Sequence, residues 1–116
     1  MTASWNQTRF LAGLGPMQPM SVVFLQAFLT SLQQHLDILA HAKMPEDAAL
    51  IRHSAHSIKG SASQVFCVEL SRIASELERI STADHGLVSE AIIKLSLQAK
   101  LEVAAVLRFI EDQGSS

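Results

Sequence analysis

Apolar residues recur every three or four positions along most of the chain, and this periodicity limits the fold more than any other feature. The clearest series is Ile51, Ala55, Ile58, Ala62 and Val65. This spacing places apolar side chains on one stripe of an α-helix, whereas a half-buried strand would alternate at every second residue. The sequence therefore predicts an all-α protein.

Turn residues divide the chain into one short helix and four long ones. The short helix is expected to begin near Ser4, which has capping-box spacing to Gln7, and to stop at residues 13–16, Gly-Leu-Gly-Pro. Short connections favour an antiparallel up-down four-helix bundle with an additional N-terminal helix, formed by residues 1–116 as one domain. The first long helix is expected to begin near Pro19, and the second to carry Glu46 and Asp47 in its first turn. The third is expected to include Leu70–Ile80. After a loop at Ser81–Gly86, the fourth is expected to span about Leu87–Ile110.

The composition is typical of a folded globular domain that does not bind nucleic acid. Hydrophobic residues make up 48% of 116 positions, and charged residues make up 17%. The formal charge is −2, and the nine Lys and Arg residues are scattered, so no basic stripe is available for a phosphate backbone.

The single cysteine and the lengths of the apolar runs indicate where such a chain would work. Cys67 has no partner for an internal disulfide, and its neighbours Phe66 and Val68 predict a buried, inert thiol. The apolar runs are too short to cross a bilayer, and the N-terminus lacks the pattern of a secretory signal. We therefore expect a cytoplasmic protein without a membrane partner.

One exposed patch of the third predicted helix carries the informative side chains. At about 100° per residue, His56 falls roughly 140° from the centre of the apolar stripe. Lys59, Gly60 and Ser63 follow His56 at three, four and seven residues, and Arg52 precedes it by four. These five residues therefore share a solvent-facing surface.

The chemistry of this patch suits phosphoryl transfer. A neutral imidazole is a nucleophile near pH 7 and forms a labile phosphoramidate. Lys59 would balance incoming negative charge, and Ser61 and Ser63 could donate hydrogen bonds to phosphoryl oxygens. Gly60 costs about 1 kcal/mol in a helix relative to alanine, and its bare backbone would let a partner approach His56.

The segment His56–Ala62, His-Ser-Ile-Lys-Gly-Ser-Ala, resembles the signature of histidine-containing phosphotransfer (HPt) domains. Leu70, Leu77 and Glu78 also fit the pattern of that family's next helix. The resemblance implies that His56 is the phosphoacceptor, that Lys59 supports it electrostatically, and that Gly60 gives clearance. In chemotaxis-type relatives, the glutamate matching Glu78 bonds the acceptor imidazole.

The resemblance also implies a phosphorelay intermediate that serves response-regulator receiver domains and a histidine kinase, which can be of the hybrid type. Such a module needs no cofactor of its own, because Mg²⁺ is carried by the receiver domain. It has no ATP site and is not an enzyme by itself. The docking face for a receiver is expected to include apolar and small residues of the second helix, between Phe28 and Leu36.

One position departs from the family pattern. Ten residues after His56, where the family usually has glycine, this chain has Phe66. Glycine at a helix end permits the left-handed backbone of a tight turn. We therefore expect the third helix to end differently or to continue further.

Three other interpretations stay open at this stage. The chain could be the phospho-accepting part of a larger histidine kinase, or a helical adaptor that binds without chemistry. His53 and His56, three residues apart, could also share a metal, but zinc usually takes three or four ligands and no further set has ligand spacing. We therefore predict no metal site.

Overall fold

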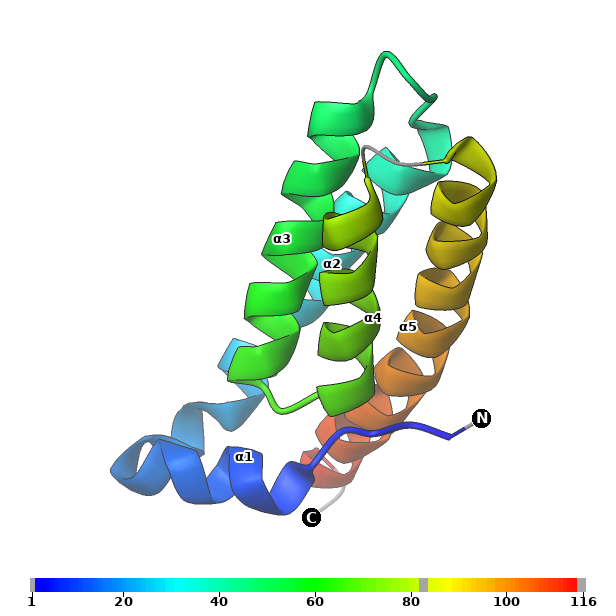
Figure 1. The fold of residues 1–116 in the computed structure, drawn as a ribbon. Helices are drawn as coiled ribbons and strands as arrows, with labels where there is room; N and C mark the ends of the chain where they lie inside the picture. The colour runs from blue at the N-terminus through cyan, green and yellow to red at the C-terminus, as the bar shows by residue number, and fades with distance from the viewer. Residues whose placement is uncertain (1, 82–83, 115–116) are drawn as a thin grey trace.

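The computed structural model describes residues 2–81 and 84–114, and most of them are helical. Figure 1 shows a short helix and a 3₁₀ turn that project from one end of four long helices. In chain order the elements are α1 (Gln7–Leu14), η1 (Gly15–Met20), α2 (Ser21–His41), α3 (Ala48–Gln64), α4 (Val68–Ile80) and α5 (His85–Gln113).

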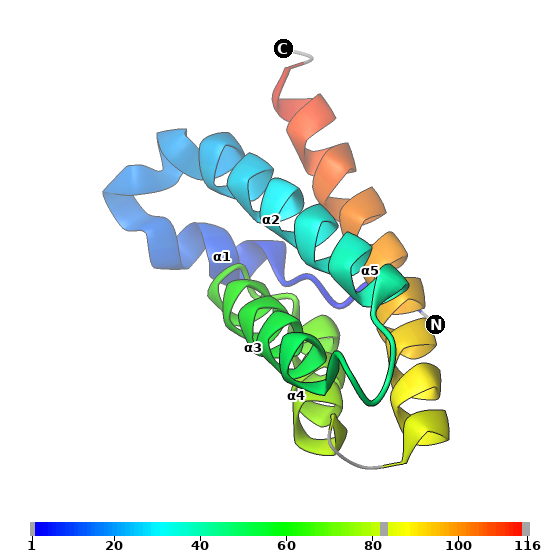
Figure 2. The same cartoon turned by 90° about the horizontal axis from the view of Figure 1, so that it is seen from above.

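The four long helices form a closed ring of neighbours. Contacts join α2 to α3, α3 to α4, α4 to α5, and α5 back to α2, so α3 and α5 occupy opposite corners. Figure 2, viewed from above, shows this arrangement. The predicted all-α bundle is confirmed. In the described ranges, every helix lacks the length or the apolarity that a membrane span requires.

The predicted apolar stripes form the core. All five residues of the α3 series are buried, and the stripes of α2, α4 and α5 supply most of the remaining core. The periodicity did not predict two polar residues of α5, Gln98 and Glu102, which are also buried.

The N-terminus of α1 differs from the prediction. Asn6, not Ser4, caps this helix, because its side-chain oxygen accepts a hydrogen bond from the Arg9 N–H at 3.0 Å. The Ser4 hydroxyl instead accepts from the Glu69 N–H in the first turn of α4, at 2.7 Å. Local spacing therefore identified a capping residue but assigned it to the wrong helix.

The Glu102 carboxylate holds this N-terminal segment in place. It accepts hydrogen bonds from the Ser4 backbone N–H, from the Ser4 hydroxyl at 3.0 Å, and from the Gln98 amide at 3.3 Å. A buried carboxylate needs several such donors, because burial removes its hydration. Cys67 lies beside it and is fully buried as predicted; burial raises the pKa of its thiol, and the Glu102 charge adds to that effect.

Two other helix starts also differ from the expected boundaries. Asp47 stands before the first residue of α3, so the acidic first turn that we predicted is wrong. Its carboxylate accepts from the Lys43 N–H at 2.8 Å and closes the turn between α2 and α3. α5 begins at His85, with Asp84 as its cap, so Gly86 belongs to the helix and not to the predicted loop. Positions 82 and 83 of that loop lie outside the described residues.

Phe66 adopts the backbone conformation that a glycine would favour at this position. Its φ is +67°, in the left-handed region. The Cys67 N–H donates to the Ala62 carbonyl at 2.9 Å, and the Phe66 N–H donates to the Ser63 carbonyl at 3.2 Å. This pair of bonds is the Schellman ending of a helix. The expected different or longer ending is therefore wrong, because α3 stops at Gln64.

Contacts with α1 compensate for the unusual backbone of Phe66. The Arg9 guanidinium lies over its ring, 5.1 Å from the centroid, and its carbonyl accepts from the Asn6 N–H at 2.9 Å. The ring therefore docks the N-terminal segment at the turn between α3 and α4.

Replacing Phe66 by glycine and by alanine separates strain from packing. Both variants lose the ring, but only glycine relieves the left-handed backbone, so we expect Phe66→Gly to be more stable than Phe66→Ala by about 1 kcal/mol. Urea unfolding measures the difference. At Gln64, inside the helix, the same pair should show the opposite order. An alanine variant at Phe66 as stable as the glycine variant would contradict the strain.

Candidate functional site

α3 and α4 bring together side chains that are about 20 residues apart in the sequence. The buried faces of the two helices include Ala55, Ala62 and Ala74. Alanine allows helix backbones to approach closely, because it fills little of the space between them. A long polar side chain on α4 can therefore reach across to the exposed face of α3.

Glu78 of α4 makes this connection. One of its carboxylate oxygens, Oε2, lies 2.8 Å from Nδ1 of His56, and the other, Oε1, accepts from Nζ of Lys59 at 2.6 Å. The side chain of His56 is 64% exposed, against 34% for Lys59 and 20% for Glu78. The contact that the resemblance implied for Glu78 is thus present.

The carboxylate determines which ring nitrogen carries the proton. An ionised carboxylate only accepts hydrogen bonds, so Nδ1 of His56 must be the donor. In the neutral ring, Nε2 then keeps its lone pair. The exposed side of the imidazole therefore presents a nucleophilic nitrogen to a molecule that approaches from solvent.

The comparisons with known proteins agree with this geometry. The family model described as Hpt domain matches residues 23–108. The chain belongs to the Hpt domain family. No curated protein and no solved structure matches it significantly. Hpt domains act in phosphotransfer in two-component signalling, and the matched range includes His56, Lys59 and Glu78.

Gly60 does not serve close packing of helices in this Hpt domain. A Cβ placed at Gly60 would meet no atom within 4 Å. Its backbone is also ordinary helix, within α3. Neither the space nor the backbone requires glycine there, so the cost in helix propensity must have another origin. Gly60 leaves open the surface one turn from His56.

The other residues of the predicted patch take different positions. The Ser63 hydroxyl lies 2.6 Å from the Ser71 hydroxyl, which itself donates to the Lys59 carbonyl at 3.2 Å. Ser63 must therefore donate to Ser71 in this arrangement. Arg52 is exposed and lines a shallow groove that Glu78 and other α4 residues also line. It adds positive charge near the site.

The second histidine of α3 faces a different helix. The ring centroids of His53 and His35 of α2 are 6.5 Å apart. Burial, and in second place His53, lower the pKa of His35. The structure thus does not bring His53 and His56 to one site. Among residues 2–81 and 84–114, no three His, Cys, Asp or Glu side chains gather as a metal would require.

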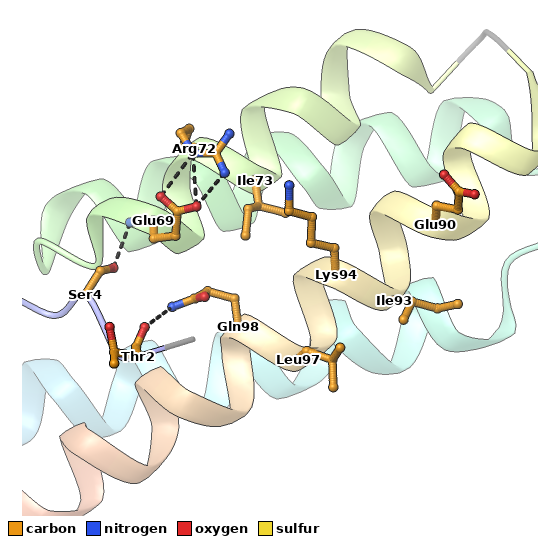
Figure 3. Close-up of a pocket in the computed structure, with 10 residues that line it drawn as sticks. All are labelled: Thr2, Ser4, Glu69, Arg72, Ile73, Glu90, Ile93, Lys94, Leu97 and Gln98. Atoms are coloured by element: carbon orange, nitrogen blue, oxygen red, sulfur yellow. Dashed lines mark hydrogen bonds and ion pairs between the residues drawn. The ribbon is translucent and has the colours of Figure 1, made fainter.

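A prominent hollow of the domain is separate from this site. It is a groove of about 680 Å³ between α4 and α5, which Figure 3 shows with its lining residues. Glu69 and Arg72 of α4 form an ion pair on its rim. Neither His56 nor Glu78 lines this groove.

The pKa of Glu78 gives a first test of the site. The Lys59 hydrogen bond is the largest cause that lowers it, followed by the hydrogen bond from His56, while burial acts in the opposite direction. A lowered folded-state pKa means that the contact stabilises the fold above the ordinary pKa of glutamate and that this contribution is lost as the pH falls through the lowered value.

We expect carboxyl ¹³C NMR to show Glu78 titrating below the ordinary glutamate range. Lys59→Met should move the midpoint upward, because it removes the main hydrogen bond. The His56 Nδ1 resonance should shift over the same pH range as Glu78 protonates. A Glu78 midpoint that is unchanged in Lys59→Met would contradict this arrangement.

Gly60→Ala gives a second test, which concerns the stability of the fold. Because open space surrounds the added methyl group, helix propensity should raise the free energy of unfolding by about 0.5–1 kcal/mol. Urea unfolding measures this change. A destabilised variant would show that Gly60 serves packing after all.

Proposed function

We propose that this Hpt domain is a phosphorelay intermediate in which Nε2 of His56 takes a phosphoryl group from a receiver-domain aspartate and passes it to another receiver. The hydrogen bond between Nδ1 of His56 and Glu78, at 2.8 Å, is the observation that carries the proposal. It supports a ring whose reactive nitrogen is both unprotonated and exposed.

The transfer is an in-line displacement at phosphorus. The lone pair of Nε2 forms the new N–P bond while the bond between phosphorus and the aspartyl oxygen breaks, and the aspartate leaves as a carboxylate. Nδ1 keeps its proton throughout. The ring thereby becomes a phosphorylated imidazolium, whose positive charge the Glu78 carboxylate stabilises at hydrogen-bond distance.

Lys59 and the partner share the remaining electrostatic work. Nζ of Lys59 is bound to Glu78 but is about one-third exposed, so it can also face the phosphoryl oxygens. The receiver is expected to bring the Mg²⁺ that neutralises the transferred group. The domain thus acts as a phosphoryl carrier rather than as an enzyme by itself.

The two sides of His56 suggest where the receiver docks. At about 100° per residue, Arg52 and Lys59 lie on the α4 side of His56, while Gly60 and Gln64 lie on the α2 side. Gln64 lines an apolar groove of about 410 Å³ together with Phe24 and other residues of α2. A receiver placed over Gly60 would therefore rest on α2.

We place the docking face at the start of α2 and at part of the range that the sequence indicated, because Phe28 and Ser31 line the groove beside Gln64. Phe28 and Leu32, within the expected range, are buried in the core. Exposed apolar side chains occur instead at Met20, Val23 and Phe24. We therefore assign the receiver contact to the first turns of α2 and to the groove beside Gln64.

Incubation with a panel of phosphorylated receivers tests this function. We expect an acid-labile phosphoryl group to appear on the chain and to be absent from His56→Gln, because the side chain lost is the nucleophile. His53→Gln is the matched control, since it changes an exposed histidine three residues away. Equal labelling of His56→Gln would exclude His56 as the acceptor. No labelling of the wild type across the panel would favour a helical adaptor.

Glu78→Gln should slow transfer without preventing it. The amide still reaches His56 but carries no charge to stabilise the phosphorylated imidazolium, so we expect a rate roughly 10- to 100-fold lower. Rapid-quench measurement with one receiver gives this rate. Glu76→Gln, which changes another glutamate of α4 that is paired with Arg79, is the control and should transfer at the wild-type rate.

A further inference from the structure

One face of α5, at the edge of the groove between α4 and α5, carries a largely exposed apolar stripe. Ile93 is 61% exposed and Leu97 is 47% exposed, although both lie in the middle of a long helix. Figure 3 shows these two side chains pointing away from α4, while Lys94 points toward it. Exposed apolar side chains that form a contiguous patch commonly mark an interaction site.

Charged residues mark the two ends of this stripe. At about 100° per residue, Glu90, Ile93, Leu97, Leu101, Ala104 and Arg108 all fall within about 40° of the direction of Leu97. The order along the seam is therefore acidic, apolar, apolar, apolar, small and basic; Leu101 is half-buried and the other five residues are exposed. This regular spacing of three and four residues is that of a helix that packs along another helix.

The end charges are free to bind a partner. In the part of the chain that the structure describes, neither Glu90 nor Arg108 forms an ion pair. The seam lies on α5, at the corner of the bundle opposite α3, the helix that carries His56. A molecule bound along α5 would leave His56 open.

We propose that α5 pairs with α5 of a second copy of this chain, in antiparallel orientation. The two-fold axis crosses the seam at the level of residue 99 along the helix. This axis places Glu90 opposite Arg108 of the other copy, and Arg108 opposite its Glu90. Ile93 then meets the small Ala104, and Leu97 meets Leu101. The seam is thus complementary to itself in charge and in side-chain size.

The charges exclude the parallel alternative and favour a second copy over an unrelated helix. In a parallel pair, Glu90 would face Glu90 and Arg108 would face Arg108, which is repulsive. Glu90 and Arg108 are 18 residues apart, or about 27 Å along the helix at 1.5 Å per residue. A partner helix therefore needs a basic and an acidic residue at the same separation but in the reverse order. A second α5, turned by the two-fold axis, carries this pattern. Lys100 lies at the edge of the seam, where its stem can lie along the apolar surface with its ammonium group in solvent.

The dimer would be weak, since a single helix pair buries less than a permanent interface needs. We expect a dissociation constant on the order of 10 µM for the dimer. Two acceptor histidines would then lie on the outer sides of one particle. Self-association does not depend on the proposed phosphotransfer, so either can fail without the other.

Sedimentation velocity between about 1 µM and 1 mM tests whether the chain dimerises along this face. Wild type should shift from monomer to dimer, and Leu97→Glu should weaken association at least tenfold. Leu50→Glu is the matched control, because Leu50 is 44% exposed on α3 and should leave the dimer intact. Monomer at every concentration, or equal loss in both variants, would overturn the proposal.

Charge reversal tests the antiparallel register. Glu90→Arg alone and Arg108→Glu alone should each weaken homodimers about tenfold, because each variant places two like charges opposite each other. A mixture of the two variants should form heterodimers, and the double variant should recover wild-type association. The proposed register would be overturned if the mixture of the two variants associated no better than each variant alone. Thermal melting checks that each variant remains folded.

Discussion

The Glu78 carboxylate, placed between His56 and Lys59, makes the interaction on which the proposed phosphotransfer depends. A histidine that is 64% exposed has little packing to orient it, so one strong hydrogen bond must set both its rotamer and its tautomer. Because Lys59 binds the other oxygen, the carboxylate stays ionised and in place. The side chain that we propose as the phosphoacceptor can therefore remain open to solvent and still be oriented.

That interaction depends in turn on the turn between α3 and α4. The left-handed Phe66 ends α3 so that α4 returns along it in the register that brings Glu78 to His56. A glycine would make this turn at lower cost. Phe66 makes it while its ring binds Arg9 and its carbonyl binds the Asn6 N–H, so the same residue also attaches the N-terminal segment.

Periodicity and motif spacing predicted the helices, the core stripes and the exposed face of α3, because each follows from local geometry along one helix. They did not predict the role of Ser4, which has a local capping pattern but binds Glu69 and Glu102 far along the chain. Glu102 itself occupies a stripe position where a charge argues against burial, and only its donors from the N-terminal segment make burial favourable. Residue spacing along one helix does not predict contacts between segments that are far apart in the sequence.

Stability and reactivity are thus separated along the length of the bundle. The buried polar cluster at Glu102 fixes the end where the N-terminal segment crosses α4 and α5. The middle of α3 instead presents His56 beside an unfilled surface at Gly60. Because this surface forms no enclosed pocket, it cannot choose a phosphoryl donor by shape around the small group. Selectivity must then come from the wider surface that a receiver covers, and we propose that the apolar first turns of α2 form part of that surface.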